Sequence, residues 1–278
     1  MDLGRQARHP RAGRRRAALL GFAAACSILT ACAESNKVPA GTREPDKFLF
    51  ERGSALLQDK KWLTAREMLR QLVENFPQSP YRPDAKLGVA DSFLGEGSTA
   101  SVVLAINEYR EFLTFYPTNQ RADYAQYKLG YCHFKQMLAP QRDQSETREA
   151  VKEFETFVQR YPNSALMGEV KARLRDARDR FSDSEYNVGY FYFRARWFPG
   201  AVDRFKSILK NDPEYTRRDG VYFYLAEALL KTDKKAEALP YYERLITEFV
   251  QSEYLEDAHK RVDELKPALA PTTTSRPE

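Results

Sequence analysis

The sequence predicts an all-α protein, a right-handed α-solenoid of helix pairs, from a pattern that recurs five times. In each copy an Ala is followed four residues later by a large apolar residue, and in four copies a Pro stands eight residues after that. Residues four apart share a helix face, so the Ala lets a neighbouring helix approach and the larger side chain fills the space beside it. The Pro ends the helix because it lacks an N–H group and clashes with the preceding turn. The copies are Ala65-Leu69-Pro77, Ala105-Tyr109-Pro117, Ala150-Phe154-Pro162, Ala201-Phe205-Pro213 and Ala238-Tyr242-Val250.

A small residue lies upstream of each Ala, inside a second run of apolar residues at helical spacing. The separation is 12 residues in three copies and 17 and 20 residues in the other two, where longer loops are expected. A small residue in one helix, the Ala–aromatic pair in the next and a closing Pro match the tetratricopeptide repeat. The sequence therefore predicts five tetratricopeptide-like helix pairs. The small residues are Gly53, Gly88, Gly130, Gly189 and Ala226.

Apolar residues at positions i, i+3, i+4 and i+7 place the individual helices. Asp46 is the expected N-cap of the first helix, and Pro83 and Pro199 occupy first-turn positions that tolerate Pro. The last helix is the C-terminal capping helix that a solenoid needs at its open end. The solenoid is expected over 46–266, with helices at 47–58, 62–76, 83–94, 102–116, 122–136, 147–161, 165–194, 196–210, 216–231, 234–250 and 253–265.

Three segments depart from the regular repeat. Residues 165–194 keep an apolar period without a Pro, which predicts one helix of about thirty residues. Its middle alternates Lys or Arg with Asp, typical of a solvated face with i,i+4 pairs worth about 0.3–0.5 kcal/mol each. Residues 95–101 are expected to form a loop. Residues 137–146 are the longest internal insertion, either a working surface or a solvated loop that tolerates insertion.

Residues 1–31 have the composition of an export signal. Six arginines precede an apolar run from 17 to 31, which is too short to span a bilayer as a permanent helix. The run ends in Leu29-Thr30-Ala31-Cys32, which resembles a bacterial lipobox, so we expect a lipoprotein signal peptide and an acylated Cys32. A short transmembrane anchor is the alternative. No Asp follows Cys32, and resemblance to lipoprotein sorting rules then implies lipid anchoring at the periplasmic face of the outer membrane.

The segments that flank the solenoid are polar. Residues 32–45 contain two Pro and one Gly and are expected to form a flexible tether, and residues 267–278 are expected to be disordered. Without the six arginines and one aspartate of residues 1–31, the 44 basic and 39 acidic residues become 38 of each. The net charge of +5 therefore belongs to the leader, and the near-neutral remainder argues against a nucleic-acid partner.

Few residues offer catalytic chemistry. His133 adjoins Cys132, but neighbours on a helix point about 100° apart and cannot form a dyad unaided. Cys132 is the one cysteine left after Cys32, so we expect a buried thiol and no intramolecular disulfide. The sequence has no metal-ligand motif and no phosphate-binding loop, so no metal, no cofactor and no enzymatic activity are expected.

The order of lipobox, tether, five repeat pairs and capping helix resembles the BamD family of outer-membrane β-barrel assembly lipoproteins. Two stretches strengthen the likeness, Tyr161-Pro162-Asn163-Ser164 and YFYFRARWFPGAVDRF from Tyr190 to Phe205. The resemblance implies a scaffold whose C-terminal pairs dock on the periplasmic domains of the barrel-forming subunit. It also implies other assembly lipoproteins as partners, and N-terminal pairs that receive unfolded outer-membrane proteins.

The resemblance places partner-binding residues in the fourth pair. Arg204 matches a family Arg in that pair's second helix, and Arg194, Arg196 and Trp197 belong to the same stretch. The residues alone leave two roles open for Arg204, an interface contact or a salt bridge inside the solenoid to Asp203 or the preceding helix. Two other functions also stay open: another outer-membrane repeat lipoprotein, such as a pilus pilotin or division-linked scaffold, or the helical ring of a transglycosylase.

Overall fold

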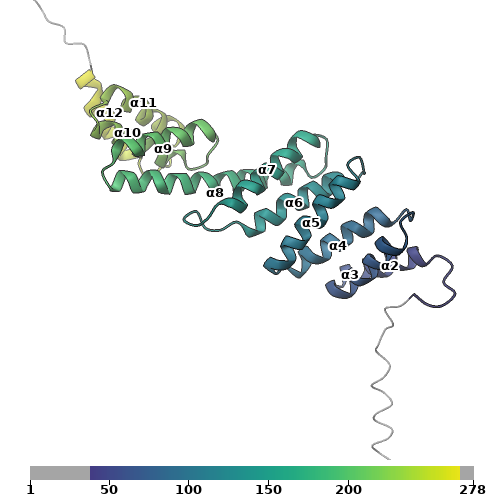
Figure 1. The fold of residues 1–278 in the computed structure, drawn as a ribbon. Coiled ribbons are helices and arrows are strands. Elements are labelled where there is room, and N and C mark those ends of the chain that lie inside the picture. The colour runs from purple at the N-terminus through teal and green to yellow at the C-terminus, as the bar shows by residue number, and fades with distance from the viewer. Residues whose placement is uncertain (1–37, 270–278) are drawn as a thin grey trace, which may run out of the picture.

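The computed structural model describes residues 38–269, and every regular element within that range is a helix. The helices form an elongated array in which each packs against the next along the chain (Figure 1). The leader 1–31, Cys32 and the tether as far as residue 37 lie outside the described residues. The helices are α2 (Pro45–Gln58), α3 (Trp62–Asn75), α4 (Arg82–Glu96), α5 (Thr99–Phe115), α6 (Ala122–Gln136), α7 (Ser145–Arg160), α8 (Met167–Arg194), α9 (Phe198–Asn211), α10 (Arg218–Lys231), α11 (Lys235–Glu248) and α12 (Leu255–Leu269).

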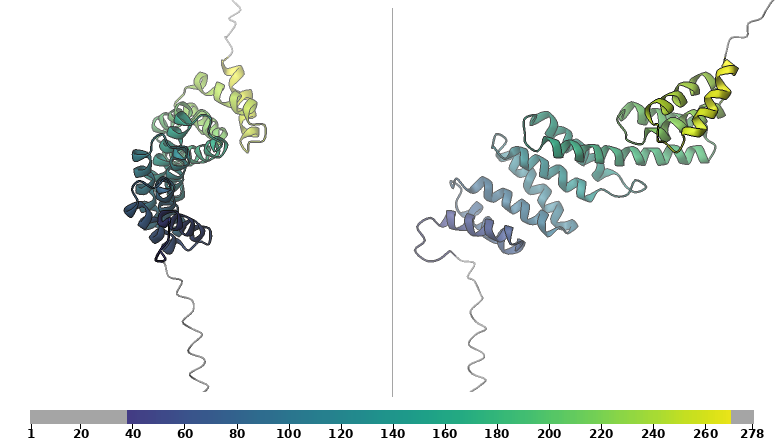
Figure 2. Two further views of the ribbon diagram at one scale, coloured as in Figure 1. Left: turned by 90° about the vertical axis from the view of Figure 1, so that its right-hand side faces the viewer. Right: turned by 180° about the vertical axis from the view of Figure 1, so that it is seen from behind.

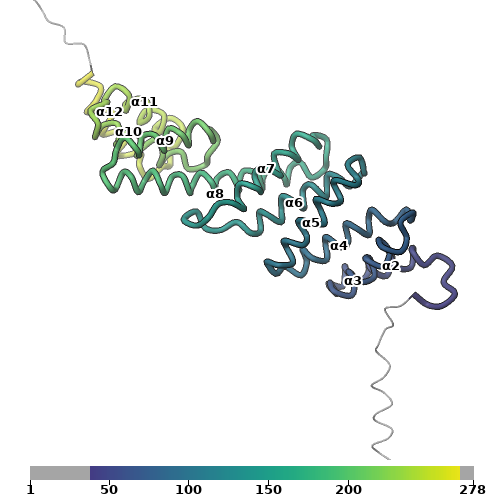
Figure 3. The backbone as a smooth tube through the Cα atoms, viewed as in Figure 1, coloured from purple at the N-terminus to yellow at the C-terminus, as the bar shows by residue number. Residues whose placement is uncertain are grey.

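Five helix pairs and a final helix account for the array, as the sequence predicts. The pairs are α2/α3, α4/α5, α6/α7, α8/α9 and α10/α11, and α12 covers α11 at the C-terminal end (Figures 2 and 3). The Ala and the large apolar residue of all five copies are fully buried. Burying one large apolar side chain contributes about 1.5–3 kcal/mol, so the repeated frame is the core of the solenoid.

The upstream glycines allow close approach between the two helices of a pair. A Cβ added at Gly53, Gly130 or Gly189 would lie 2.7, 2.7 or 2.8 Å from the side chain of Leu69, Phe154 or Phe205, the large residue of the same pair. Gly88 is also buried, in α4, but its added Cβ would meet Leu69 of the preceding pair at 2.7 Å rather than the large residue of its own pair.

The connection between α4 and α5 is shorter than expected. The predicted loop 95–101 is reduced to two residues, because Gly97 adopts a left-handed conformation (φ 77°) at the end of α4 and Ser98 caps α5. The Ser98 hydroxyl accepts a hydrogen bond of 3.1 Å from the backbone N–H of Ser101. Both helices therefore include residues of the predicted loop.

Two terminal predictions are also corrected. Asp46 is not the N-cap of α2: the helix begins at Pro45, and the Asp46 carboxylate instead accepts a hydrogen bond from the Ser79 hydroxyl. At the other end α12 continues through Pro267 to Leu269, past the predicted end at 265 and into the first three residues of the predicted tail. The rest of that tail lies outside the described residues. Within 38–269, no helix combines the length and apolar character that a membrane span requires.

The long helix α8 connects two halves of the solenoid. It has 28 residues, against 14 to 17 in the other described helices, which confirms the single long helix expected at 165–194. Its N-terminal half packs in one apolar cluster with α6 and α7, and its C-terminal half packs in another with α9 to α12. Figure 1 shows α7 and α9 near opposite ends of α8.

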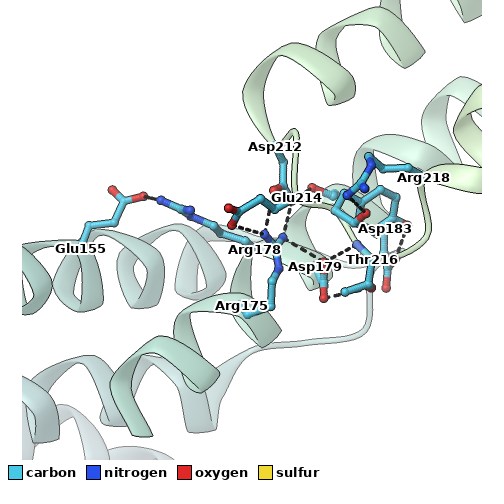
Figure 4. A network of polar contacts seen from close by, with 11 residues as sticks. Glu155, Arg175, Arg178, Asp179, Asp183, Asp212, Glu214, Thr216 and Arg218 are labelled. Atoms are coloured by element: carbon cyan, nitrogen blue, oxygen red, sulfur yellow. Dashed lines mark hydrogen bonds and ion pairs between the residues drawn. The ribbon is translucent and has the colours of Figure 1, made fainter. Parts of the chain in front are cut away.

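A network of polar contacts fixes α8 to the loop between α9 and α10 (Figure 4). Arg175 donates two hydrogen bonds to the Asp212 carboxylate, at 2.9 and 2.5 Å, and Ser182 donates a third at 2.7 Å. One turn along α8, Asp179 accepts hydrogen bonds from the backbone and hydroxyl of Thr216. Burial opposes ionisation of Asp212, but the hydrogen bonds from Arg175 and Ser182 outweigh it and lower the pKa of that carboxyl.

Candidate partner-binding surface at the turn between α8 and α9

Three of the four predicted partner-binding residues lie together at one turn. Arg194 ends α8, Arg196 lies in the turn, and Trp197 is the N-cap residue of α9. Arg196 has φ 61°, and the backbone N–H of Trp197 bonds to the carbonyl of Tyr192 at 2.9 Å, as in a Schellman motif. The turn is therefore tight and points its side chains outward.

The same type of turn connects the two helices of the first pair and the two helices of the fifth pair. Lys60 and Asp233 have φ values of 60° and 59°, and each is followed by a residue whose N–H bonds five residues back. A non-glycine residue in this conformation costs about 1–2 kcal/mol. The turn geometry thus belongs to the repeat, whereas the aromatic side chains of the fourth copy are particular to it.

Exposed aromatic side chains surround the turn. The Trp197 indole is 55% exposed, and its position is fixed by edge-on packing on Tyr192, with ring centroids 4.5 Å apart. The indole also lies over Gly200, where an added Cβ would come within 2.7 Å of it. Phe191 is 65% exposed and contacts Tyr192. We call Phe191, Tyr192 and Trp197 the α8–α9 aromatic patch.

Phe191 was missed as a site residue. The signal was present in the run Tyr190-Phe191-Tyr192-Phe193, because four consecutive helical positions cannot all face the core. Gly189 and Phe193 direct their face of α8 inward, which leaves Phe191 on the outside.

The arginines differ in their partners. Arg194 donates to the Tyr190 hydroxyl at 3.4 Å, and this hydrogen bond is the main reason that the pKa of Tyr190 lies below its ordinary value. Arg196 is exposed in the turn. Arg204 is not part of the patch: it lies seven residues beyond Trp197 and donates to Glu185 of α8 at 2.9 Å. Of the salt bridges considered for Arg204, the one to the preceding helix is present.

A second candidate surface lies on the inner face of the N-terminal half. A groove of about 460 Å³ is lined by residues of α2, α3, α4 and α6, among them Trp62, Tyr124, Tyr131 and Lys135. Lys128 also lines it, with its ammonium 5.3, 5.8 and 5.6 Å from the ring centroids of Tyr124, Tyr127 and Tyr131. Aromatic faces and ammonium groups thus share one open groove, which we call the inner-face groove.

The two residues considered for catalysis, Cys132 and His133, are both buried within the solenoid. Cys132 is buried, as expected, and burial raises the pKa of its thiol to about 12, so the thiol is protonated near neutral pH. His133 is also buried, and its Nδ1 lies 2.7 Å from a carboxylate oxygen of Glu146. Among the described residues, no group of three or more His, Cys, Asp or Glu side chains could hold a metal ion.

The chain is also similar to solved structures at low sequence identity. The chain is similar to the TPR2AB-domain:pHSP90-complex of yeast Sti1, with a TM-score of 0.44 and 14% identity over 80% of this chain and 83% of that one.

Curated relatives with the name "Outer membrane protein assembly factor BamD" cover more of the chain. The Caulobacter vibrioides protein is 26% identical over 244 residues, which are 86% of this chain and 79% of the relative. The Neisseria meningitidis serogroup B protein is 25% identical over 249 residues, 84% of this chain and 92% of the relative. The Rickettsia prowazekii protein is 23% identical over 229 residues, which are 82% of this chain and 88% of the relative.

A family profile matches the solenoid itself. Residues 42–238 match the family described as "YfiO: Outer membrane lipoprotein", from the residues just before α2 to the first turn of α11. This match includes the first four helix pairs, the long helix α8 and the α8–α9 aromatic patch. Together with the curated relatives, it confirms the resemblance found in the sequence: the chain belongs to the YfiO family of outer membrane lipoproteins, in which its curated relatives have the name BamD.

Proposed function

We propose that this protein is a lipoprotein scaffold of the outer-membrane β-barrel assembly machinery, which aids the folding and insertion of outer-membrane proteins without catalysing a reaction. The observation that carries the proposal is the family match over residues 42–238, supported by relatives with the name of assembly factors. A solenoid suits this role, because stacked helix pairs expose extended surfaces to several partners at once.

The anchor in this proposal is Cys32, acylated after removal of residues 1–31. Acyl chains contribute about 0.8 kcal/mol per buried methylene group, so a multiply acylated cysteine would hold the solenoid at the membrane. The tether 32–45 would then place the solenoid at the periplasmic face of the outer membrane.

The α8–α9 aromatic patch is the proposed docking surface for the periplasmic domains of the barrel-forming subunit. Trp, Tyr and Arg dominate the energetics of protein interfaces, and this turn gathers all three types. Trp197 is held rigid by Tyr192 and Gly200 while more than half of it stays exposed, so little side-chain entropy would be lost on binding. Arg194 and Arg196 would supply charge-assisted hydrogen bonds at the rim.

The inner-face groove is the proposed site for unfolded outer-membrane proteins. Trp62, Tyr124 and Tyr131 offer ring faces to aromatic side chains of an extended segment. Lys128 and Lys135 line the same groove and could pair with a chain-terminal carboxylate. Other assembly lipoproteins would bind the remaining outer surface.

The test is a tagged pull-down from envelope membranes with the full-length protein. Recovery of the barrel-forming subunit is the expected result, reduced by Trp197→Ala and unchanged by the matched surface change Leu63→Ala, at a side chain of α3 that is 65% exposed. Recovery of pilus or secretin components instead would replace the proposal with a pilotin-like role. Cleavage of peptidoglycan by the purified chain would replace it with an enzyme.

A further inference from the structure

A cleft of about 460 Å³ opens between α7 and α9, above the middle of α8. Its floor is apolar and is made of Val151 on α7, Phe181 on α8 and Ile208 on α9. We propose that this α7–α9 cleft binds an amphipathic helix of a partner protein, which presents an apolar stripe flanked by acidic residues.

The length of α8 creates the cleft. In the second and fifth pairs, α4 and α10 have 15 and 14 residues and lie between the helices that precede and follow them. The 28 residues of α8 hold α7 and α9 apart, so α7 covers the end near Val170 and α9 covers the end near Gly189. The turn around Phe181 is left without a helix on that side, although a regular solenoid would cover it.

The lining has the periodicity of helix faces. On α8 the cleft residues are 178, 181, 182 and 185, and on α7 they are 148, 151, 152 and 155. Each set follows i, i+3, i+4, i+7, which is a single face of a helix. Two helix faces that meet in a groove accept the ridge of a third helix, and an amphipathic helix in an apolar groove is a common recognition mode.

Charge determines which helix fits. The acidic residues that line the cleft already have cationic partners: Glu155 pairs with Arg178, Glu185 with Arg204 and Asp212 with Arg175, at 2.7, 2.9 and 2.5 Å. Arg148 at the rim donates to the Ser145 hydroxyl at 3.2 Å, and among the described residues no carboxylate lies within ion-pair distance of it. Lys152, one turn further along the same rim, pairs with Glu149 of its own helix at 3.0 Å, so Arg148 is the rim cation that a partner's carboxylate can bind. A partner with a carboxylate beside its apolar stripe can pair with Arg148, whereas a basic helix finds no carboxylate in this lining that lacks a cationic partner.

The cleft is separate from both surfaces of the proposed function. None of its lining residues belongs to the α8–α9 aromatic patch or to the inner-face groove. Its failure as a binding site would therefore leave the assembly role standing, and the assembly role could fail while the cleft still binds.

The test uses the full-length chain and two synthetic 16-residue amphipathic helices as probes. Both probes have leucines at i, i+3, i+4 and i+7 spacing. One has glutamates at the remaining positions, and the other has lysines. Fluorescence anisotropy is expected to give a Kd at least tenfold lower for the acidic probe. Methyl NMR is expected to show the largest shifts at Val151 and Ile208. Equal affinity for the two probes, or shifts confined to the other two surfaces, would overturn the proposal.

Variants locate the site and its charge preference. Val151→Glu is expected to raise the Kd of the acidic probe at least tenfold. The double change Arg148→Glu with Lys152→Glu is expected to make the lysine probe bind more tightly than the acidic probe. The control is Lys171→Glu, at an exposed position of α8 outside the cleft, which should leave both affinities unchanged. If Val151→Glu lowers the melting temperature, the exposed double variant alone decides the matter. If the double variant still binds the acidic probe more tightly, the probe does not bind in the α7–α9 cleft and the proposal is contradicted.

Discussion

The hydroxyl of Ser164 donates a hydrogen bond of 2.6 Å to the carboxylate of Asp123, which joins the loop after α7 to the first turn of α6. The same Ser hydroxyl accepts the backbone N–H of Leu166 at 3.1 Å, so it fixes the turn as well as the pair. The relationship recurs as Ser79–Asp46 and Ser252–Asp219, both at 2.7 Å. Each of these serines stands two residues after the last position of the repeated frame.

We predict that Ser164→Ala destabilises the solenoid by about 1–2 kcal/mol, because a hydrogen bond to a charged acceptor is lost while the carboxylate stays partly buried. Urea denaturation followed by circular dichroism measures the change in the free energy of unfolding. Thr114→Ala is the control, since the exposed Thr114 hydroxyl donates only to the Arg110 carbonyl of its own helix. Equal midpoints for Ser164→Ala and the parent would show that the hydroxyl is replaced by water at no cost.

The second prediction concerns acid stability at the joint of α8 and the α9–α10 loop. The pKa of Asp212 is lowered from its ordinary value of 3.8, so its contribution to stability is complete above that value and is lost as the pH falls through the lower, folded-state pKa. Ser182→Ala removes one of the hydrogen bonds that lower this pKa. We expect the pKa of Asp212 to rise and the loss of stability on acidification to begin at a higher pH.

Carboxyl NMR titration of the parent and of Ser182→Ala, with melting temperatures between pH 3 and 7, checks this second prediction. Thr156→Ala is a suitable control, because the Thr156 hydroxyl donates only to a backbone carbonyl of its own helix. A pKa of Asp212 that does not move in Ser182→Ala would contradict the cause assigned here.

Most of the fold followed from the sequence, because Ala and aromatic residues at helical spacing report directly on burial. Ala150 and Phe154 were predicted to face a partner helix, and both are fully buried against it. The errors arose where local hydrogen bonds compete with periodicity: Gly97 and Ser98 shorten a loop because one adopts φ > 0 and the other caps a helix. Asp46 has a cap-forming side chain, but Ser79, far away in sequence, takes its carboxylate.

The candidate site was only partly visible in the sequence. The stretch around Trp197 was found by family resemblance, whereas the exposure of Phe191 depends on the orientation of α8 against α9 and α10. The partner of Arg204 is separated from it by a turn and part of another helix, so spacing could not choose Glu185 over Asp203. The α7–α9 cleft depends on how far α8 separates its neighbours, which only tertiary packing determines.

The third prediction tests the strained turn at the surface. Arg196→Gly should stabilise the protein by about 0.5–1 kcal/mol, because Gly avoids the cost of φ 61° but loses more backbone entropy on folding. Thermal unfolding measures the gain. Arg194→Gly, in the last turn of α8, should instead destabilise by about 1 kcal/mol through its low helix propensity. A loss of stability in Arg196→Gly would mean that the arginine side chain makes a compensating contact.

The fourth prediction concerns the anchor. Cys32→Ser should leave the protein soluble or as an uncut precursor, because serine cannot form the thioether that carries the lipid. Membrane fractionation and the mass of the mature chain provide the measurement, with Cys132→Ser as the matched control that keeps the anchor. Tight membrane attachment and normal processing of Cys32→Ser would disprove lipidation at this residue.

The fifth prediction separates the two roles of Arg204. Its bridge to Glu185 is partly exposed, with 43% and 30% of the two side chains accessible, so the bridge contributes at most about 1 kcal/mol to stability. If Arg204 binds the barrel-forming subunit, Arg204→Glu should abolish co-purification with little change in melting temperature, because truncating a buried interfacial ion pair costs about 2–5 kcal/mol.

The charge swap Arg204→Glu with Glu185→Arg restores an internal bridge but moves the cation to α8. A swap that keeps the parent's melting temperature but does not bind assigns Arg204 to the interface, whereas restored binding in the swap would assign it to the internal salt bridge alone.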